Sequence, residues 1–382
     1  MASDSSDKLA LSMVSAQGRE PVVISVDAMG GDRGPAAVVA GLVLVLRDHD
    51  DLHVILHGDE AQIAPLLARE PALRGRVTLR HSDRVVTMGD KPSQVMRHGQ
   101  GTSMWSAIDS VKEGEARVAV SCGNTGALMA VSMLRLRKLP GINRPAIACL
   151  WPSRSPQGWS VMLDVGADIR ADAEDLLQYA IMGAAYASDA LALDLPKVGL
   201  MNVGTEEHKG RPELKEAHEL LTRAAGAAAG FDYVGFIEGS DLPSPHVNVI
   251  VMDGFTGNVA LKTGEGTAKL VGDFLREAFS AGILSRFAAL LALNSLKRLQ
   301  KRIDPRRVNG GVFLGLNGAV VKSHGGADAT GVAAAVGLAH RLARSGFTER
   351  LAARVASVAA AGQDAAAVEP AEQARAGSDP QR

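Results

Sequence analysis

The feature that most constrains this chain is a recurring pattern in which a short β-branched run ends in a glycine-rich turn and a helical stretch follows. The clearest of these runs span residues 22–26, 118–121, 198–201 and 247–252. Further strands are predicted at 54–56, 77–80, 146–150, 161–165 and 320–321. Continuously apolar strands that alternate with helices are typical of a parallel sheet covered by helices on both faces. The sequence therefore predicts an α/β fold, with ligands bound by the loops that follow the strands.

The two ends of the chain differ from the region between them. Residues 1–20 and 361–382 are rich in small and polar residues and contain little that a core could bury. Such segments cannot offset their chain entropy by burying apolar surface. We expect a disordered leader over 1–20, a single α/β domain over 21–360 and a disordered tail over 361–382.

Composition and charge exclude several function classes. The 382 residues carry 41 Lys and Arg against 42 Asp and Glu, so no global basic field favours nucleic acid. Two cysteines form neither a disulfide framework nor a zinc-type spacing. No apolar run approaches the roughly 20 residues of a membrane span. We expect no metal ion, no cofactor and no nucleic acid partner.

Residues 267–307 contain no strand signal and are predicted to form one or two helices. The end of this segment is basic, with Lys297, Arg298, Lys301 and Arg302. Cationic side chains stabilise a helix C-terminus without any partner, so an ordinary solvated helix end explains them. A helix that lies on anionic lipid, or that docks an acidic partner, explains them as well.

Two glycine-rich turns follow the first and fourth predicted strands. Asp27 opens a loop that contains Gly30 and Gly31, and Asn124, Thr125 and Gly126 form the other turn. A glycine loop at a helix N-terminus exposes N–H groups that bind phosphate, although it also serves as a plain strand-to-helix turn. Cys122 precedes the second turn, where a thiol nucleophile is an alternative to a packed cysteine.

Polar side chains crowd three further loops that follow predicted strands, one of them at 253–258, and Lys262 lies on the helix predicted after that loop. These side chains are Thr205, His208, Lys209, Asp253, Thr256, Asn258, Lys262, Ser323 and His324. Groups of this kind hold phosphate or polarise a carbonyl, whereas a solvated loop is the plainer explanation. His53 and His57 lie on a strand pattern and are expected only to pack.

Several of these loops match the sequence motifs of a known family, and the motifs occur in the same order along the chain. The matching motifs are 26–32, 123–127, 144–147, 163–166, 202–210, 236–239 and 253–262. With these motifs the chain resembles the bacterial acyl-ACP:phosphate acyltransferases of phospholipid synthesis over about residues 22–342. The flank of the Ser-His-Gly core at 323–325 departs from the family pattern, so His324 is the better site residue there than Lys322.

The resemblance implies a Rossmann-like three-layer α/β/α fold that is similar to phosphotransacetylases, with a helical protrusion over 267–307. It implies transfer of a long fatty acyl chain from acyl carrier protein to inorganic phosphate, by a cytoplasmic homodimer that touches the membrane peripherally. A membrane glycerol-3-phosphate acyltransferase would then consume the acyl phosphate. The alternatives are a short-chain phosphotransacetylase that uses acyl-CoA, and a non-catalytic protein that docks the carrier protein at the membrane.

Within this scheme the residues fall into three groups. We expect His208, Lys209, Asn258 and His324 to act on the carbonyl or the incoming anion. The residues expected to bind substrate or phosphate are Asp27, Gly30, Gly31, Asn124, Thr125, Gly126, Thr205, Asp253, Thr256, Lys262 and Ser323. Contacts to the membrane or the carrier protein are expected from Lys297, Arg298, Lys301 and Arg302.

Overall fold

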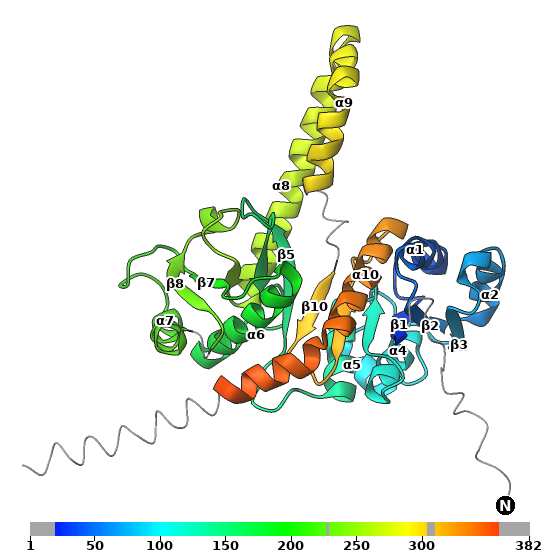
Figure 1. Cartoon of the computed structure of the whole chain (residues 1–382), viewed down its shortest axis with the longest axis horizontal. Coiled ribbons are helices and arrows are strands. Elements are labelled where there is room, and N and C mark those ends of the chain that lie inside the picture. The colour runs from blue at the N-terminus through cyan, green and yellow to red at the C-terminus, as the bar shows by residue number, and fades with distance from the viewer. Residues whose placement is uncertain (1–19, 227–228, 304–309, 359–382) are drawn as a thin grey trace, which may run out of the picture. The chain divides into compact units, whose positions relative to one another are not determined.

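The computed structural model describes residues 20–226, 229–303 and 310–358, without the side chains of 297–303. The chain forms two compact units. Of the described residues, unit 1 comprises 20–136 and 318–344, and unit 2 comprises 137–226, 229–303, 310–317 and 345–358. Figure 1 gives the labels of their elements.

Unit 1 contains a fully parallel sheet. In spatial order its strands are β3 (Val77–His81), β2 (Leu52–Gly58), β1 (Val22–Asp27), β4 (Val118–Ser121) and β11 (Ala319–Lys322). The register pairs Asp27 with Ser121, and Ser121 with Lys322. The carboxyl ends of three neighbouring strands therefore lie level with one another.

Helices follow the strands of unit 1. They are α1 (Gly34–Asp48), α2 (Glu60–Ala68), α3 (Pro92–His98), α4 (Ser103–Lys112), α5 (Thr125–Leu136) and α10 (Ala329–Ser345), with a 3₁₀ turn at Pro71–Leu73. Pro35 stands in the first turn of α1, where a missing N–H costs nothing. At Gly41 an added Cβ would lie 2.6 Å from Cβ of Val332, so α1 and α10 pack closely.

His57, on β2 of unit 1, is buried and is held by three hydroxyls, of which Oγ of Ser110 lies 3.4 Å from its Nε2. Its Nε2 lies 2.9 Å from Oγ of Ser25, and its Nδ1 lies 2.8 Å from Oγ of Ser106. Burial lowers the pKa of His57 to about 3, so the ring is neutral at pH 7. The prediction that His57 packs is confirmed.

Unit 2 contains a mixed sheet. In spatial order its strands are β10 (Gly311–Leu314), β5 (Ala146–Pro152), β6 (Trp159–Leu163), β9 (Val249–Val251), β7 (Lys197–Met201) and β8 (Asp232–Ile237). β5 runs antiparallel to both of its neighbours, and the other pairs are parallel. The strands are therefore mostly parallel, as expected for this fold class, and β5 is the exception. Residues 153–158 are too short a connection for a parallel crossover between β5 and β6.

Four long helices accompany this sheet. They are α6 (Ala173–Leu191), α7 (Pro212–Ala224), α8 (Gly254–Ser280) and α9 (Ile283–Ile303), with a 3₁₀ turn at Gly239–Asp241. Residues 347–358 are also helical. α8 and α9 pack side by side as a hairpin that extends away from the strands of unit 2 (Figure 1). This hairpin is the helical protrusion that the family resemblance implies.

The start of α8 differs from the sequence prediction, which places 253–258 in a loop. The helix begins at Gly254, because the side chain of Asp253 caps it by accepting the N–H of Thr256 at 2.8 Å. The mostly parallel strands with flanking helices confirm the α/β prediction. Within the described residues, no helix has the length and apolar content needed to cross a membrane.

Candidate active site

Three glycine-bearing loops of unit 1 leave the level carboxyl ends of β1, β4 and β11. Each loop leads into a helix, and these helices, α1, α5 and α10, are 15, 12 and 17 residues long. Helix N-termini present unpaired N–H groups and a partial positive charge, which suits an anionic ligand. This edge of unit 1 is therefore suited to bind an anion.

Asp27 ties two of these loops together from beneath. Its buried carboxylate accepts the hydroxyl of Ser121 at 2.7 Å and the N–H of Met29 at 3.1 Å. The Ser121 hydroxyl in turn accepts the N–H of Gly123 at 3.0 Å. Burial raises the pKa of the Asp27 carboxyl, although the Ser121 donor favours its ionised form. In this structure Asp27 links the loops, and its contact with substrate or phosphate stays a prediction.

Because Gly30 has no side chain, the backbone of the loop after β1 can approach the backbone of the loop after β4 closely. An added Cβ there would lie 2.8 Å from N of Gly123 and 2.5 Å from the Asp27 carboxylate. Beside it, a Cβ at Gly31 would lie 3.2 Å from the carbonyl oxygen of Gly325. The structure thus brings the predicted residues Asp27, Gly30 and Gly31 together with the turn that follows β4.

Asn124 has a structural task. Its Oδ1 accepts the N–H of Ala127 at 3.0 Å and so caps α5, while its Nδ2 donates to the carbonyls of Met88 and Asp90 at 2.9 and 3.1 Å. Thr125 and Gly126 are exposed in the first turn of the same helix. Because the Asn124 amide is already hydrogen-bonded within the protein, Thr125 and Gly126 are the better candidates in this turn for binding an anion.

The loop after β11 contributes Ser323 and His324. The buried Ser323 donates its N–H to the carbonyl of Ser121 at 2.9 Å. His324 is exposed, and its Nδ1 accepts the N–H of Gly326 at 3.1 Å. Burial raises the pKa of the Cys122 thiol, which favours a packed cysteine over a nucleophile.

In unit 2 the polar residues gather after β7 and β9. Asp253, at the end of β9, accepts an ion-pair hydrogen bond from Nη2 of Arg211 as well as the N–H of Thr256. Burial opposes ionisation of Asp253, but these donors outweigh it and hold the pKa of the carboxyl below its usual value. Asp253 therefore joins the loop after β7 to the start of α8.

The loop after β7 carries three predicted residues. Thr205 and His208 are exposed, and Nζ of Lys209 lies 2.8 Å from Oε1 of Glu206. That hydrogen bond raises the pKa of Lys209 and lowers the pKa of Glu206. Nδ2 of Asn202 donates to the carbonyl of Lys209 at 3.3 Å and supports the loop from the strand end.

The first turns of α8 carry the remaining predicted residues. Asn258 is exposed, and Nζ of Lys262 lies 2.8 Å from Oε2 of Glu265. Lys209 and Lys262 are thus each paired with a carboxylate three residues away in sequence. An incoming anion would compete with that carboxylate for the ammonium group.

Sequence reasoning missed three residues that support these loops: Ser121, Asp164 and Arg211. All three aspartates lie at strand ends: Asp27 is the last residue of β1, Asp164 follows β6 directly, and Asp253 lies two residues after β9. That shared position at a strand end is the signal that could have found it. The side chains of Lys297, Arg298, Lys301 and Arg302, on the last turns of α9, lie outside the described residues. In the part of the chain that is described, no group of His, Cys, Asp and Glu is arranged to hold a metal ion.

Comparisons with known proteins agree with this architecture. A family model described as "Fatty acid synthesis protein" matches residues 22–350. The chain is 72% identical over 350 residues to a phosphate acyltransferase of Cereibacter sphaeroides, covering 92% of this chain and 95% of that protein. It is 71% identical over 343 residues to a phosphate acyltransferase of Paracoccus denitrificans, covering 90% and 92%.

Solved structures show the same fold at low sequence identity. The EutD phosphotransacetylase from Staphylococcus aureus matches with a TM-score of 0.54 at 16% identity, over 87% of this chain and 95% of that chain. A phosphotransacetylase from Streptococcus pyogenes matches with a TM-score of 0.53 at 16% identity, over 90% and 95%.

The architecture is therefore the three-layer α/β class of the phosphotransacetylases, as the sequence predicts. Within that class, the chain belongs to the family of fatty acid synthesis proteins whose members include the phosphate acyltransferases. It is an acyltransferase, which excludes the non-catalytic docking protein.

Proposed function

We propose that this acyltransferase transfers a long-chain fatty acyl group from acyl carrier protein to inorganic phosphate, which gives an acyl phosphate for phospholipid synthesis. The observation that carries the proposal is the set of three helix N-termini at the level ends of β1, β4 and β11. The family membership and the name shared by the relatives support phosphate as the acceptor.

The reaction needs little from the protein beyond positioning and charge. A phosphate oxygen attacks the thioester carbonyl carbon, a C–O bond forms, and the C–S bond breaks to release the thiolate of the carrier. Phosphate is already an anionic nucleophile near pH 7, so no strong base is required. Orientation contributes about 7–11 kcal/mol in such reactions, and one oxyanion donor contributes about 2.7–4 kcal/mol.

In unit 1 the anion would be bound by backbone N–H groups and short side chains. The residues proposed for this role are Gly30, Gly31, Thr125, Gly126 and Ser323, with His324 beside them and with Asp27 and Asn124 supporting the loops. In unit 2 we assign the acyl carbonyl or the phosphate to His208, Lys209 and Asn258. Thr205, Thr256 and Lys262 would assist these residues, and Asp253 would orient them.

A comparison of acyl donors tests the function. With inorganic phosphate present, palmitoyl-ACP is expected to give an acyl phosphate, trapped as its hydroxamate, at a rate at least 100-fold above that with acetyl-CoA. A short-chain phosphotransacetylase would show the opposite preference. Reactions without enzyme and without phosphate measure the hydroxamate that forms by direct attack of hydroxylamine on the thioester. An enzyme-dependent hydroxamate yield that phosphate does not raise would refute acyl phosphate as the product.

We further propose that the hairpin of α8 and α9 contacts the membrane, where a glycerol-3-phosphate acyltransferase would consume the product. Large apolar side chains are exposed along it, including Ile283 at 90%, Leu284 at 83% and Phe287 at 60%. Exposed apolar surface on this scale indicates an interaction site, either with lipid or with a second copy of the chain in the expected homodimer.

Vesicle binding tests the membrane contact. Wild-type protein is expected to co-sediment with anionic phosphatidylglycerol vesicles, and added salt is expected to weaken this binding. Leu284→Glu should reduce the bound fraction several-fold, because it places a charge in the apolar contact. Leu195→Glu, at an exposed leucine outside the hairpin, is the matched control. Equal binding of both variants would argue against the hairpin.

A further inference from the structure

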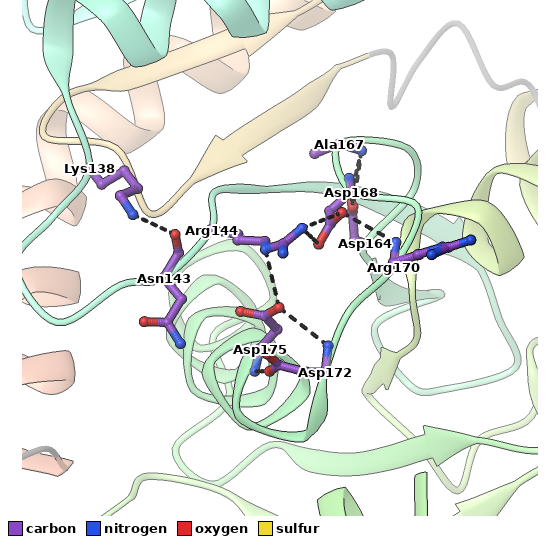
Figure 2. Close-up of polar contacts among 9 residues, drawn as sticks. All are labelled: Lys138, Asn143, Arg144, Asp164, Ala167, Asp168, Arg170, Asp172 and Asp175. Atoms are coloured by element: carbon purple, nitrogen blue, oxygen red, sulfur yellow. Dashed lines mark hydrogen bonds and ion pairs between the residues drawn. The ribbon is translucent and has the colours of Figure 1, made fainter. Parts of the chain in front are cut away.

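Arg144 bridges two acidic side chains in unit 2, as Figure 2 shows. Its Nη1 lies 2.9 Å from each carboxylate oxygen of Asp168, and its Nε lies 3.4 Å from Oδ2 of Asp175. The Arg144 side chain is 51% exposed, whereas Asp168 and Asp175 are 12% and 1% exposed. A single guanidinium therefore offsets two carboxylates, one of which is completely enclosed.

Asp168 ends the hydrogen-bonded turn 164–168, at the start of the loop that joins β6 to α6. The buried carboxylate of Asp164 accepts four backbone N–H groups, from Ile147, Gly166, Ala167 and Asp168, at 2.7 to 3.1 Å. Asp164 thus fixes the loop from within (Figure 2). Arg144 fixes its far end by tying Asp168 to Asp175 at the start of α6.

The first turn of α8 rests directly on this loop. The N–H of Gly254 donates to the carbonyl of Asp168 at 2.7 Å. An added Cβ at Gly254 would lie 2.5 Å from the same carbonyl oxygen, and a Cβ at Gly257 would overlap the carbonyl oxygen of Asp164. With no room between the two segments, the position of Asp168 sets the position of the helix start.

We propose that Arg144 is a positioning residue for acyl transfer, which acts by holding Asp168 and, through it, the start of α8, with Asp253 as its N-cap and Asn258 just beyond its first turn. Without the guanidinium, only the backbone N–H groups of Arg170 and Asp172, among the described residues, face the carboxylates of Asp168 and Asp175, no cation offsets their repulsion, and the loop moves outward. The role rests on the proposed function, which places Asn258 in the site. Arg144 itself need not touch either substrate.

The test compares Arg144→Gln with a matched ion pair elsewhere in unit 2. Arg350 and Asp189 are 53% and 15% exposed, so Arg350→Gln removes a pair of similar exposure that does not contact the loop. Arg144→Gln is expected to lower kcat/KM for phosphate about 10- to 100-fold, since small misplacements of reacting groups have effects of this size. Arg350→Gln is expected to stay within about twofold of wild type, and Arg144→Lys should recover part of the loss.

Two further measurements separate positioning from general damage. Hydrogen exchange of the backbone over 253–260 should become faster in Arg144→Gln and stay unchanged in Arg350→Gln. In an Asn258→Ala background, the kinetic effect of Arg144→Gln should largely disappear, because both changes act on the same helix start. Asp168→Asn is a milder change that replaces Arg144→Gln in these tests if Arg144→Gln does not fold. It should likewise speed hydrogen exchange over 253–260.

The possible failures can be told apart. If palmitoyl-ACP is not a donor for the wild type, the proposed function fails, and hydrogen exchange over 253–260 still decides whether Arg144 holds the helix start. If the wild type transfers acyl groups while Arg144→Gln matches Arg350→Gln in both kcat/KM and exchange, the positioning role is refuted. Full additivity with Asn258→Ala would refute it as well.

Discussion

Gly257→Ala is expected to lower acyl transfer at least 100-fold, which is one of the two largest effects that we expect in this chain. Its Cβ would occupy the space of the Asp164 carbonyl oxygen, a backbone atom that cannot rotate away. The first turn of α8 must therefore shift, and with it Asp253 and Asn258. Displacements near 1 Å cost about 100-fold in enzymes that act by orientation. Steady-state assays with palmitoyl-ACP and phosphate measure the loss.

Gly266→Ala in the same helix is the control. It lies on the exposed part of α8, where an added Cβ meets nothing within 4 Å. Alanine there should keep full activity and raise helix stability by about 1 kcal/mol. Gly257→Ala should instead lower the free energy of unfolding by about 1–3 kcal/mol, as overpacking does. Wild-type activity in Gly257→Ala would show that the close approach of α8 to the 164–168 loop has no part in transfer.

The strands of this protein could be predicted well because each is a short apolar run bounded by polar or glycine residues. The run ending at Ser121 was predicted with its bounds, and the run ending at Asp27 was predicted to within one residue. The sequence prediction omits β8 and β10, because Gly235 interrupts the apolar run of Asp232–Ile237 and Gly311–Leu314 is a run of only four residues. The start of α8 was misjudged, because Gly254 and Gly257 indicate a loop until their close approach to Asp164 is known.

The sequence predicts which loops contribute to the candidate site, but it does not predict which side chains contact one another there. A polar loop at a strand end follows from the sequence pattern alone. The task of Asn124, however, depends on carbonyls more than 30 residues away in sequence. Arg144 pairs with Asp168 and Asp175 over similar separations, so nothing local identifies its partners. Such side chains can be assigned only once the fold brings them together.

Lys209→Ala is expected to reduce kcat/KM about 100- to 1,000-fold, comparable to the loss of an oxyanion donor. The ammonium group lies on an exposed loop, where its only described ion pair is with Glu206. Exposed pairs contribute little to stability, so the variant should unfold like the wild type. Lys269→Ala, at an exposed lysine of α8, is the control for loss of one positive charge and should retain activity.

Glu206→Gln separates a substrate role of Lys209 from a structural one. If the ammonium binds the phosphate or the developing oxyanion, Glu206 competes with that ligand. Neutralising Glu206 should then leave kcat near the wild-type value and give a KM for phosphate no higher than that of the wild type. If Lys209 served only to hold the loop through this pair, removing either partner would have the same effect. Equal losses in Glu206→Gln and Lys209→Ala would therefore take Lys209 out of the site, whereas a loss confined to Lys209→Ala would place its charge on the reacting groups.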